Sequence, residues 1–128
     1  MEFEIIDESG NGRFVTKTFG QFSTENMTLM LKQLVSHNHW KKGLDLLMDH
    51  RQLSLDEATV DEVSQLAKVI GALEKDFAAG RCAMVVPDKG HGIAAIFKYA
   101  IDLKSEMVIK MFEPAEYRNA LNWLENDF

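Results

Sequence analysis

The sequence has little cysteine, no long apolar run and no secretion signal. Cys82 is the only cysteine among the 128 residues, so no internal disulfide can form. The longest unbroken apolar stretches, residues 82–86 and 93–97, fall far short of the ~18 residues that a membrane-spanning helix needs. Residues 1–4 are acidic and show no basic region leading into an apolar one. These absences predict a cytoplasmic protein with no integral membrane segment.

Basic residues are also few and scattered. Fourteen lysines and arginines stand against 20 aspartates and glutamates, which gives a formal net charge of −6. Only Lys41 and Lys42 are adjacent. Binding to nucleic acid or to an anionic membrane surface needs several clustered cations, so we expect neither partner.

Motifs for catalysis and cofactor binding are absent as well. The chain has no Gly-x-Ser-x-Gly, no P-loop, no dinucleotide-binding fingerprint, and no linker or repeat. Its 46% apolar and 27% charged residues are typical of a folded globular protein. We therefore expect residues 1–128 to form a single domain that is not an enzyme and carries no cofactor.

What the sequence does contain is an alternation of strand-like and helix-like segments. Period-two alternation and Gly-rich turn residues predict a hairpin from residues 3–7 and 13–19. Apolar spacing typical of helices occurs in four segments, namely residues 24–40, 60–77, 93–103 and 114–124. Short buried strands are expected at residues 44–48, 82–86 and 107–112. The order β-β-α-β-α-β-α-β-α predicts an α/β fold with a single mixed, mostly parallel five-stranded sheet, whose antiparallel strand lies at one edge.

Three segments carry a family resemblance. Residues 43–53 (GLDLLMDHRQL) form an apolar run ending in Asp, residues 81–88 read RCAMVVPD, and residues 115–124 (AEYRNALNWL) contain an Ala-Leu-x-Trp-Leu ending. With the element order, they resemble the SpoIIAA-like branch of the STAS (sulfate transporter and anti-sigma factor antagonist) superfamily. The resemblance covers nearly the whole chain and implies a STAS-like fold.

The same resemblance implies two kinds of function. One is a non-enzymatic regulatory or protein-interaction module in signalling, as in anti-sigma factor antagonists, with a protein partner or self-association. The other is a carrier or sensor for a small apolar or amphipathic, lipid-like ligand. We expect the first, with the carrier or sensor as the alternative, because a domain this small must use most of its apolar residues to close its own core.

A serine phosphoswitch, which the resemblance would also imply, has no clear counterpart in this chain. The corresponding position is Ala58 or Thr59, with no Ser-Gly pair. Four acidic residues surround it and would repel a phosphate, namely Asp56, Glu57, Asp61 and Glu62. Thr59 and Glu62 also form the pattern of a capping box, so we expect Thr59 to cap a helix and not to be phosphorylated.

Polar residues follow two of the predicted strands, where ligands gather in open α/β sheets. The candidate ligand-binding residues are Asp49, His50, Arg51, Asp88, Lys89 and His91. Gly90 and Gly92 would let backbone amides approach a ligand. Alternatively, Asp49 only pairs with Arg51 and the glycines serve the turn. An enzyme would require Asp49, His50 and His91 to converge.

The histidines at 37 and 39 and the single cysteine could in principle form a metal site or a reactive thiol. His37 and His39 are two apart, and on a helix such positions diverge by about 200°, so a third ligand such as His50 would have to come from elsewhere. We therefore predict no metal site. Cys82 lies in an apolar strand and is expected to be a core residue.

The helix predicted at residues 93–103 is apolar over more than one stripe. Ile93, Phe97, Ala100 and Ile101 share a face, and three residues widen it, namely Ile96, Tyr99 and Leu103. Either a neighbouring helix covers the excess, or it forms an interaction surface or the wall of an apolar pocket. We expect function to depend on this helix and the loop before it.

Overall fold

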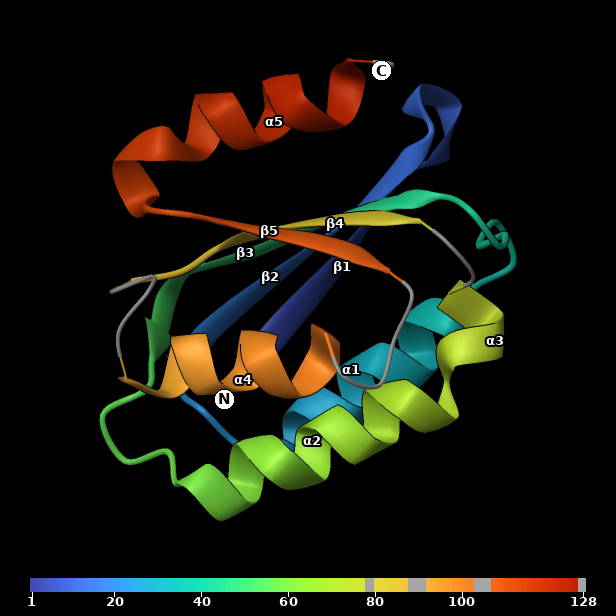
Figure 1. The fold of residues 1–128 in the computed structure, drawn as a ribbon. Helices are drawn as coiled ribbons and strands as arrows, with labels where there is room; N and C mark the ends of the chain where they lie inside the picture. Colours follow the sequence, from blue (N-terminus) through green and yellow to red (C-terminus); the bar gives the residue numbers. More distant parts are fainter. Residues whose placement is uncertain (78–79, 88–91, 103–106, 127–128) are drawn as a thin grey trace.

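One sheet of five strands forms the centre of the protein, and its strands lie in the order in which they occur in the sequence (Figure 1). The computed structural model describes residues 1–77, 80–87, 92–102 and 107–126. The strands are β1 (Glu2–Glu8), β2 (Arg13–Gln21), β3 (Asp45–Ser54), β4 (Arg81–Val85) and β5 (Val108–Phe112). β1 pairs with β2 in antiparallel fashion, and the other three pairs are parallel. The predicted mixed, mostly parallel sheet with an antiparallel edge strand is confirmed.

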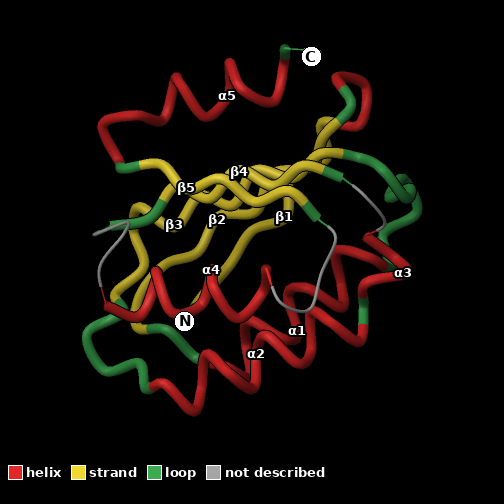
Figure 2. Tube along the Cα trace, in the orientation of Figure 1, coloured by secondary structure: helices red, strands yellow, loops and turns green. Residues whose placement is uncertain are grey.

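The helices are divided unequally between the two faces of the sheet. One face carries α1 (Thr24–Val35), α2 (Val60–Ala72), the short α3 (Glu74–Phe77) and α4 (Gly92–Asp102), and the other carries α5 (Tyr117–Glu125) (Figures 1 and 2). From β2 to β5 the chain always adds the next strand on the same side, so right-handed crossovers place every connecting helix on one face. Only the last helix, which connects no strands, is free to cover the other face.

Two apolar cores result, one on each face. The larger lies under α1, α2 and α4, and the smaller packs Val15, Leu47, Val85 and Phe112 against α5. Because β3 and β4 are covered on both faces, their central residues form nearly continuous apolar runs. None of the helices in the described ranges combines the length and the apolar character needed to cross a bilayer.

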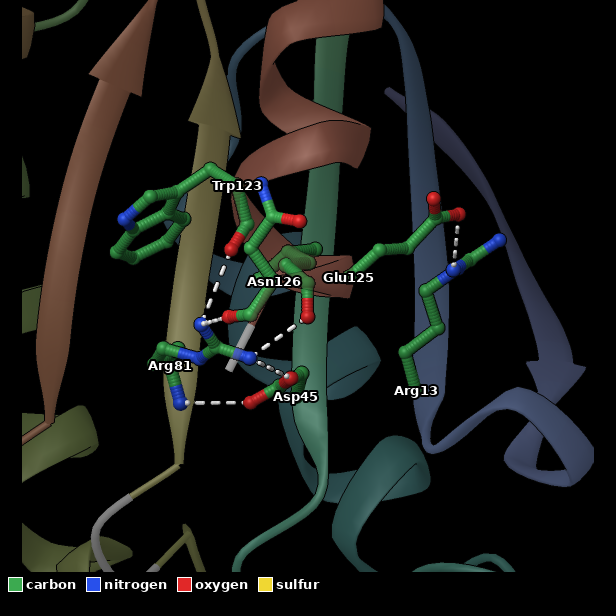
Figure 3. Close-up of polar contacts among 7 residues, drawn as sticks. Arg13, Asp45, Arg81, Trp123, Glu125 and Asn126 are labelled. Carbon is green, nitrogen blue, oxygen red and sulfur yellow. Dashed lines mark hydrogen bonds and ion pairs between the residues drawn. The ribbon is translucent and has the colours of Figure 1, made fainter. Parts of the chain in front are cut away.

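Arg81, at the start of β4, holds the end of α5 against the sheet (Figure 3). Its Nη1 donates hydrogen bonds to the carbonyl oxygens of Trp123 (3.0 Å) and Asn126 (2.7 Å). Its Nη2 donates to the carbonyl of Leu124 (2.6 Å) and to Asp45 Oδ2 (3.0 Å). The guanidinium therefore satisfies carbonyls that the end of a helix leaves without partners and links them to β3.

Three predicted element boundaries are wrong. β3 does not stop at residue 48 but continues to Ser54, because its second half pairs with β2 through Gly20↔Leu53 and Gln21↔Ser54. α1 ends at Val35, several residues before the predicted end at 39–40. The helix predicted at 60–77 is divided at Leu73 into α2 and α3.

The extension of β3 changes the setting of the candidate residues 49–51. Asp49, His50 and Arg51 lie inside the strand, and not after its end as the sequence predicted. Alternate residues of a strand point to opposite faces of the sheet. The polar group expected at one edge is therefore distributed over both faces.

Candidate functional site

An apolar cavity of about 40 Å³ lies between the sheet and helices α1, α2 and α4. Its walls include Met84 of β4, Val63 of α2, and Ala94 and Phe97 of α4. His50 of β3 is the one polar side chain among the described residues that line it. The cavity thus lies beside the helix that the sequence singled out.

A larger, open groove of about 570 Å³ runs along the carboxyl ends of β3 and β4. Ser54 and Asp56 give it polar walls, and Pro87 and Gly92 line it near the start of α4. Four residues line both the groove and the cavity, namely Leu53, Leu55, Ile93 and Ala94. The groove and the cavity therefore adjoin, with polar groups on the solvent side and apolar groups inside.

His50 is held neutral in the wall of the cavity. Its Nδ1 lies 2.7 Å from Thr18 Oγ1, and both residues are buried. Burial disfavours the charged imidazolium and lowers the pKa of His50 to about 4, against the opposing attraction of Asp49. At neutral pH this site consequently offers a polar but uncharged imidazole.

Asp49 and Arg51 lie on the opposite face of the sheet, under α5. Arg51 donates from Nε to Asp49 Oδ1 (2.9 Å) and from Nη2 to Asp49 Oδ2 (2.8 Å). The guanidinium also stacks on the ring of Tyr117, 3.9 Å from its centroid. Burial opposes the ionisation of Asp49, but the hydrogen bonds from Arg51 outweigh it and lower the pKa of the carboxyl. The Asp49–Arg51 ion pair therefore has a structural role in packing α5 against the sheet.

Among the described residues of the predicted site, the structure pairs Asp49 with Arg51 and places His50 apart from them. Asp49 and His50 face opposite sides of the sheet, so they do not form an acid–base pair. Asp88, Lys89 and His91 lie outside the described residues.

The solvent side of α4 is partly apolar, because it exposes Ile96 and Tyr99 together with the ion pair between Lys98 and Asp102. Ala94, Phe97 and Ile101 are buried, whereas Ile96 is 38% exposed and Tyr99 is 69% exposed. Within the described ranges no neighbouring helix covers these two side chains, so the alternative in which a helix buries the apolar excess does not hold for Ile96 and Tyr99. Leu103 lies outside the described residues.

The contacts of Thr59 and the burial of Cys82 indicate that both residues have structural roles. Thr59 Oγ1 accepts a hydrogen bond from the amide of Glu62 (3.2 Å), whose Oε1 accepts one from the amide of Thr59 (3.1 Å). The predicted capping box is confirmed. Cys82 is buried, and burial raises the pKa of its thiol to about 12, so the thiolate is not accessible at neutral pH.

Several residues of this site were missed by the sequence reasoning. Ser54 and Asp56 form the polar side of the groove because β3 extends to Ser54. The alternation of Leu53 and Leu55 with polar neighbours was the sequence signal for this longer strand. Thr18 carries no such signal, because only the parallel pairing of β2 with β3 brings it to His50.

Comparisons with known proteins give no match: no family model fits the chain, and neither curated proteins nor solved structures yield a significant relative. The resemblance to SpoIIAA-like STAS domains accordingly stays a prediction.

Proposed function

We propose that this protein is a carrier or sensor for a small amphipathic ligand. The apolar part of the ligand would enter the cavity beside α4, and its polar end would lie in the groove at the carboxyl ends of β3 and β4. The proposal rests on the observation that four residues, Leu53, Leu55, Ile93 and Ala94, line both the cavity and the groove, so the two adjoin. A STAS-like fold of the SpoIIAA type is part of the same proposal.

The sizes of the two spaces suggest how such a ligand would bind. A site for a small organic molecule usually measures about 300–1,000 Å³, and benzene occupies a cavity of about 150 Å³. The groove is in this range, whereas the cavity of about 40 Å³ admits only the tip of an apolar chain. Three flexible methionines among its lining residues, Met27, Met48 and Met84, would adapt to a longer apolar chain.

The polar groups support binding without catalysis. His50 is neutral and already bonded to Thr18, so it serves as a hydrogen-bonding wall group. Its neighbour Asp49 is occupied by Arg51 on the other face of the sheet. The described part of the site therefore holds a recognition group but no acid–base pair.

A matched pair of substitutions in α4 tests the proposal. Ala94 lines both spaces and is buried, whereas its neighbour Ala95 is only half-buried and lines neither of them among the described residues. Ala94→Val and Ala95→Val lower the helix propensity equally, but only the first adds methyl groups to the cavity wall. Binding of the neutral apolar fluorophore N-phenyl-1-naphthylamine is measured by its fluorescence gain, together with native mass spectrometry of freshly purified protein.

We expect the wild type and Ala95→Val to bind the fluorophore alike and Ala94→Val to bind it ~5- to 150-fold more weakly, because an overpacking cost of about 1–3 kcal/mol opposes entry. Circular dichroism confirms that both variants are folded. Equal affinity of the two variants, or no binding by the wild type, would contradict the proposal.

The second candidate function, a regulatory protein-interaction module, is favoured by a different observation. Ile96 and Tyr99 expose apolar side chains on α4. Such a surface suits a protein partner or a second copy of the chain. The two functions predict different results for a substitution at Tyr99, described below.

A further inference from the structure

Two histidines and an aspartate meet at the end of the sheet opposite to the groove. Asp7 lies near the end of β1, where it is paired with Phe14 near the start of β2. His37 and His39 follow α1, in the segment between that helix and β3. One ligand atom from each of the three residues lies within 4.8 Å of those of the others. Sequence reasoning missed Asp7. It also placed His37 and His39 within a helix, whereas α1 ends before them, at Val35.

Asp7 and His37 each make a further contact outside the cluster, and the ring of His39 is held by Asp7. Asp7 Oδ2 lies 2.5 Å from Nδ1 of His39, and its other oxygen, Oδ1, accepts a hydrogen bond from the amide of Ser9 (2.8 Å). His37 Nδ1 accepts a hydrogen bond from the amide of His39 (3.1 Å), and its ring meets Phe14 edge-on, with centroids 4.9 Å apart. The contacts with Ser9 and Phe14 are not displaced by a bound ion, and contacts of this kind orient ligand side chains around metal ions in proteins.

We propose that Asp7, His37 and His39 bind one divalent transition-metal ion, with Zn²⁺ as the best fit. Two imidazoles and one carboxylate are a donor set that suits Zn²⁺, whereas Mg²⁺ and Ca²⁺ prefer oxygen ligands and Cu⁺ prefers thiolates. Three protein ligands leave a tetrahedral position for water.

Metal binding exchanges two surface hydrogen bonds for coordination bonds. A neutral imidazole has a single lone pair on its ring nitrogens, and the His39 amide now uses that of His37. Whichever nitrogen of His37 coordinates the ion, this hydrogen bond is released, and the Asp7–His39 bond is replaced by a shared ion. Both contacts are exposed, so water can satisfy the freed amide.

The ion would also join separate parts of the fold. It would connect the end of β1, at the edge of the sheet, to the segment that leads from α1 into β3. A ligand that binds only the folded state raises the melting temperature with its concentration. Zn²⁺ should consequently stabilise the protein, and a chelator should reverse the effect.

The test uses three substitutions that preserve the local structure. Asp7→Asn keeps an oxygen to accept from the Ser9 amide but loses the charge, and His37→Phe keeps the ring contact with Phe14. His39→Ala removes an exposed ring, 66% of whose surface is accessible. Asn38→Ala, between the two histidines, is the matched control. Chelator-treated full-length chains are titrated with ZnCl₂ by calorimetry and with CoCl₂ by visible absorbance.

We expect the wild type and Asn38→Ala to bind one Zn²⁺ per chain, to show a Co²⁺ spectrum of low coordination number and to melt at higher temperature with Zn²⁺. Each ligand variant should bind Zn²⁺ at least ~10-fold more weakly and lose the shift in melting temperature. Unchanged Zn²⁺ binding by Asp7→Asn, as expected for independent binding at surface histidines, would overturn the proposal, as would no binding by the wild type. Ala94→Val should leave Zn²⁺ binding unchanged, so this site and the ligand site can fail separately.

Discussion

His50 and Thr18 face each other on the helix-covered side of the sheet, with 2.7 Å between Nδ1 and Oγ1. Burial keeps this histidine neutral at a pH where an exposed imidazole would begin to take up a proton. One strand position away, Asp49 is ionised and paired with Arg51. Two adjacent residues therefore have opposite electrostatic roles because they face opposite sides of the sheet.

This difference predicts a specific loss of stability in acid. The pKa of His50 is lowered from 6.5 to about 4 in the folded state, so as pH falls through this window the unfolded chain binds a proton that the folded chain does not. Stability should fall between about pH 6.5 and 4, by up to about 3 kcal/mol at ~1.4 kcal/mol per pKa unit. His50→Asn, which keeps a polar atom near Thr18 but does not titrate, should lose less stability over the same range. Urea unfolding at several pH values measures this, and parallel pH profiles for the two proteins would contradict it.

Thr59 is expected to matter as a helix cap. Thr59→Ala removes the acceptor for the Glu62 amide and should cost ~1 kcal/mol, whereas Thr59→Ser keeps the oxygen and should be nearly silent. The free energies of unfolding of the two variants, measured in urea, decide this. Stoichiometric phosphate on Thr59 in protein isolated from its host would argue for a regulatory role instead.

Among the elements, α5 differs from the other helices in how it is attached. It covers its face of the sheet alone among the described helices, with Ala120 and Leu124 in the small core. Arg81 binds three carbonyls at its end and also pairs with Asp45. A guanidinium can meet these acceptors in several directions at once, whereas an ammonium group acts as a point charge.

Removing this anchor should loosen α5 in particular. Arg81→Ala should destabilise the protein by about 2–3 kcal/mol, because half-buried Asp45 loses its charged partner and keeps only the amide of residue 81, and the helix end loses its donors. Arg81→Lys should recover less than half of that loss. Arg118→Ala, at an exposed position of α5, is the control and should change stability little. Urea unfolding, with hydrogen exchange over residues 117–125, tests this; full rescue by lysine would show that charge alone anchors the helix.

At the scale of the whole molecule, the one-directional winding of the sheet separates two sites. The groove lies at the carboxyl ends of β3 and β4, and the Asp7–His37–His39 cluster lies near the amino ends of β2 and β3. All connecting helices share one face, so the apolar cavity forms between them and the sheet, beneath α4.

The exposed side of α4 distinguishes the two candidate functions. Tyr99→Glu should leave the fold intact, because Tyr99 is 69% exposed. If the protein self-associates through this helix, the charge should abolish the dimer while binding of the apolar fluorophore persists. Sedimentation velocity and circular dichroism measure both properties. Unfolding of the variant would show that the ring is part of the core, and an unchanged oligomeric state would remove α4 from any self-association.

The sequence by itself determined the class of fold. Strand and helix periodicities, the Gly-rich turn, the cap at Thr59, and the apolar runs at β3 and β4 are local signals, and each produced the expected type of element, although three boundaries differ. They suffice because hydrophobic periodicity and capping act over a few residues.

Only the tertiary structure decided where the polar residues act. Pairing with β2 extended β3 past its apolar run, which placed Asp49 and His50 on opposite faces and created the groove mouth. The early end of α1 and the hairpin brought Asp7 to His37 and His39. Contacts of this kind depend on backbone pairing between segments that are distant in the sequence. The partner and the length of a strand are set by the neighbouring strands as much as by its own residues.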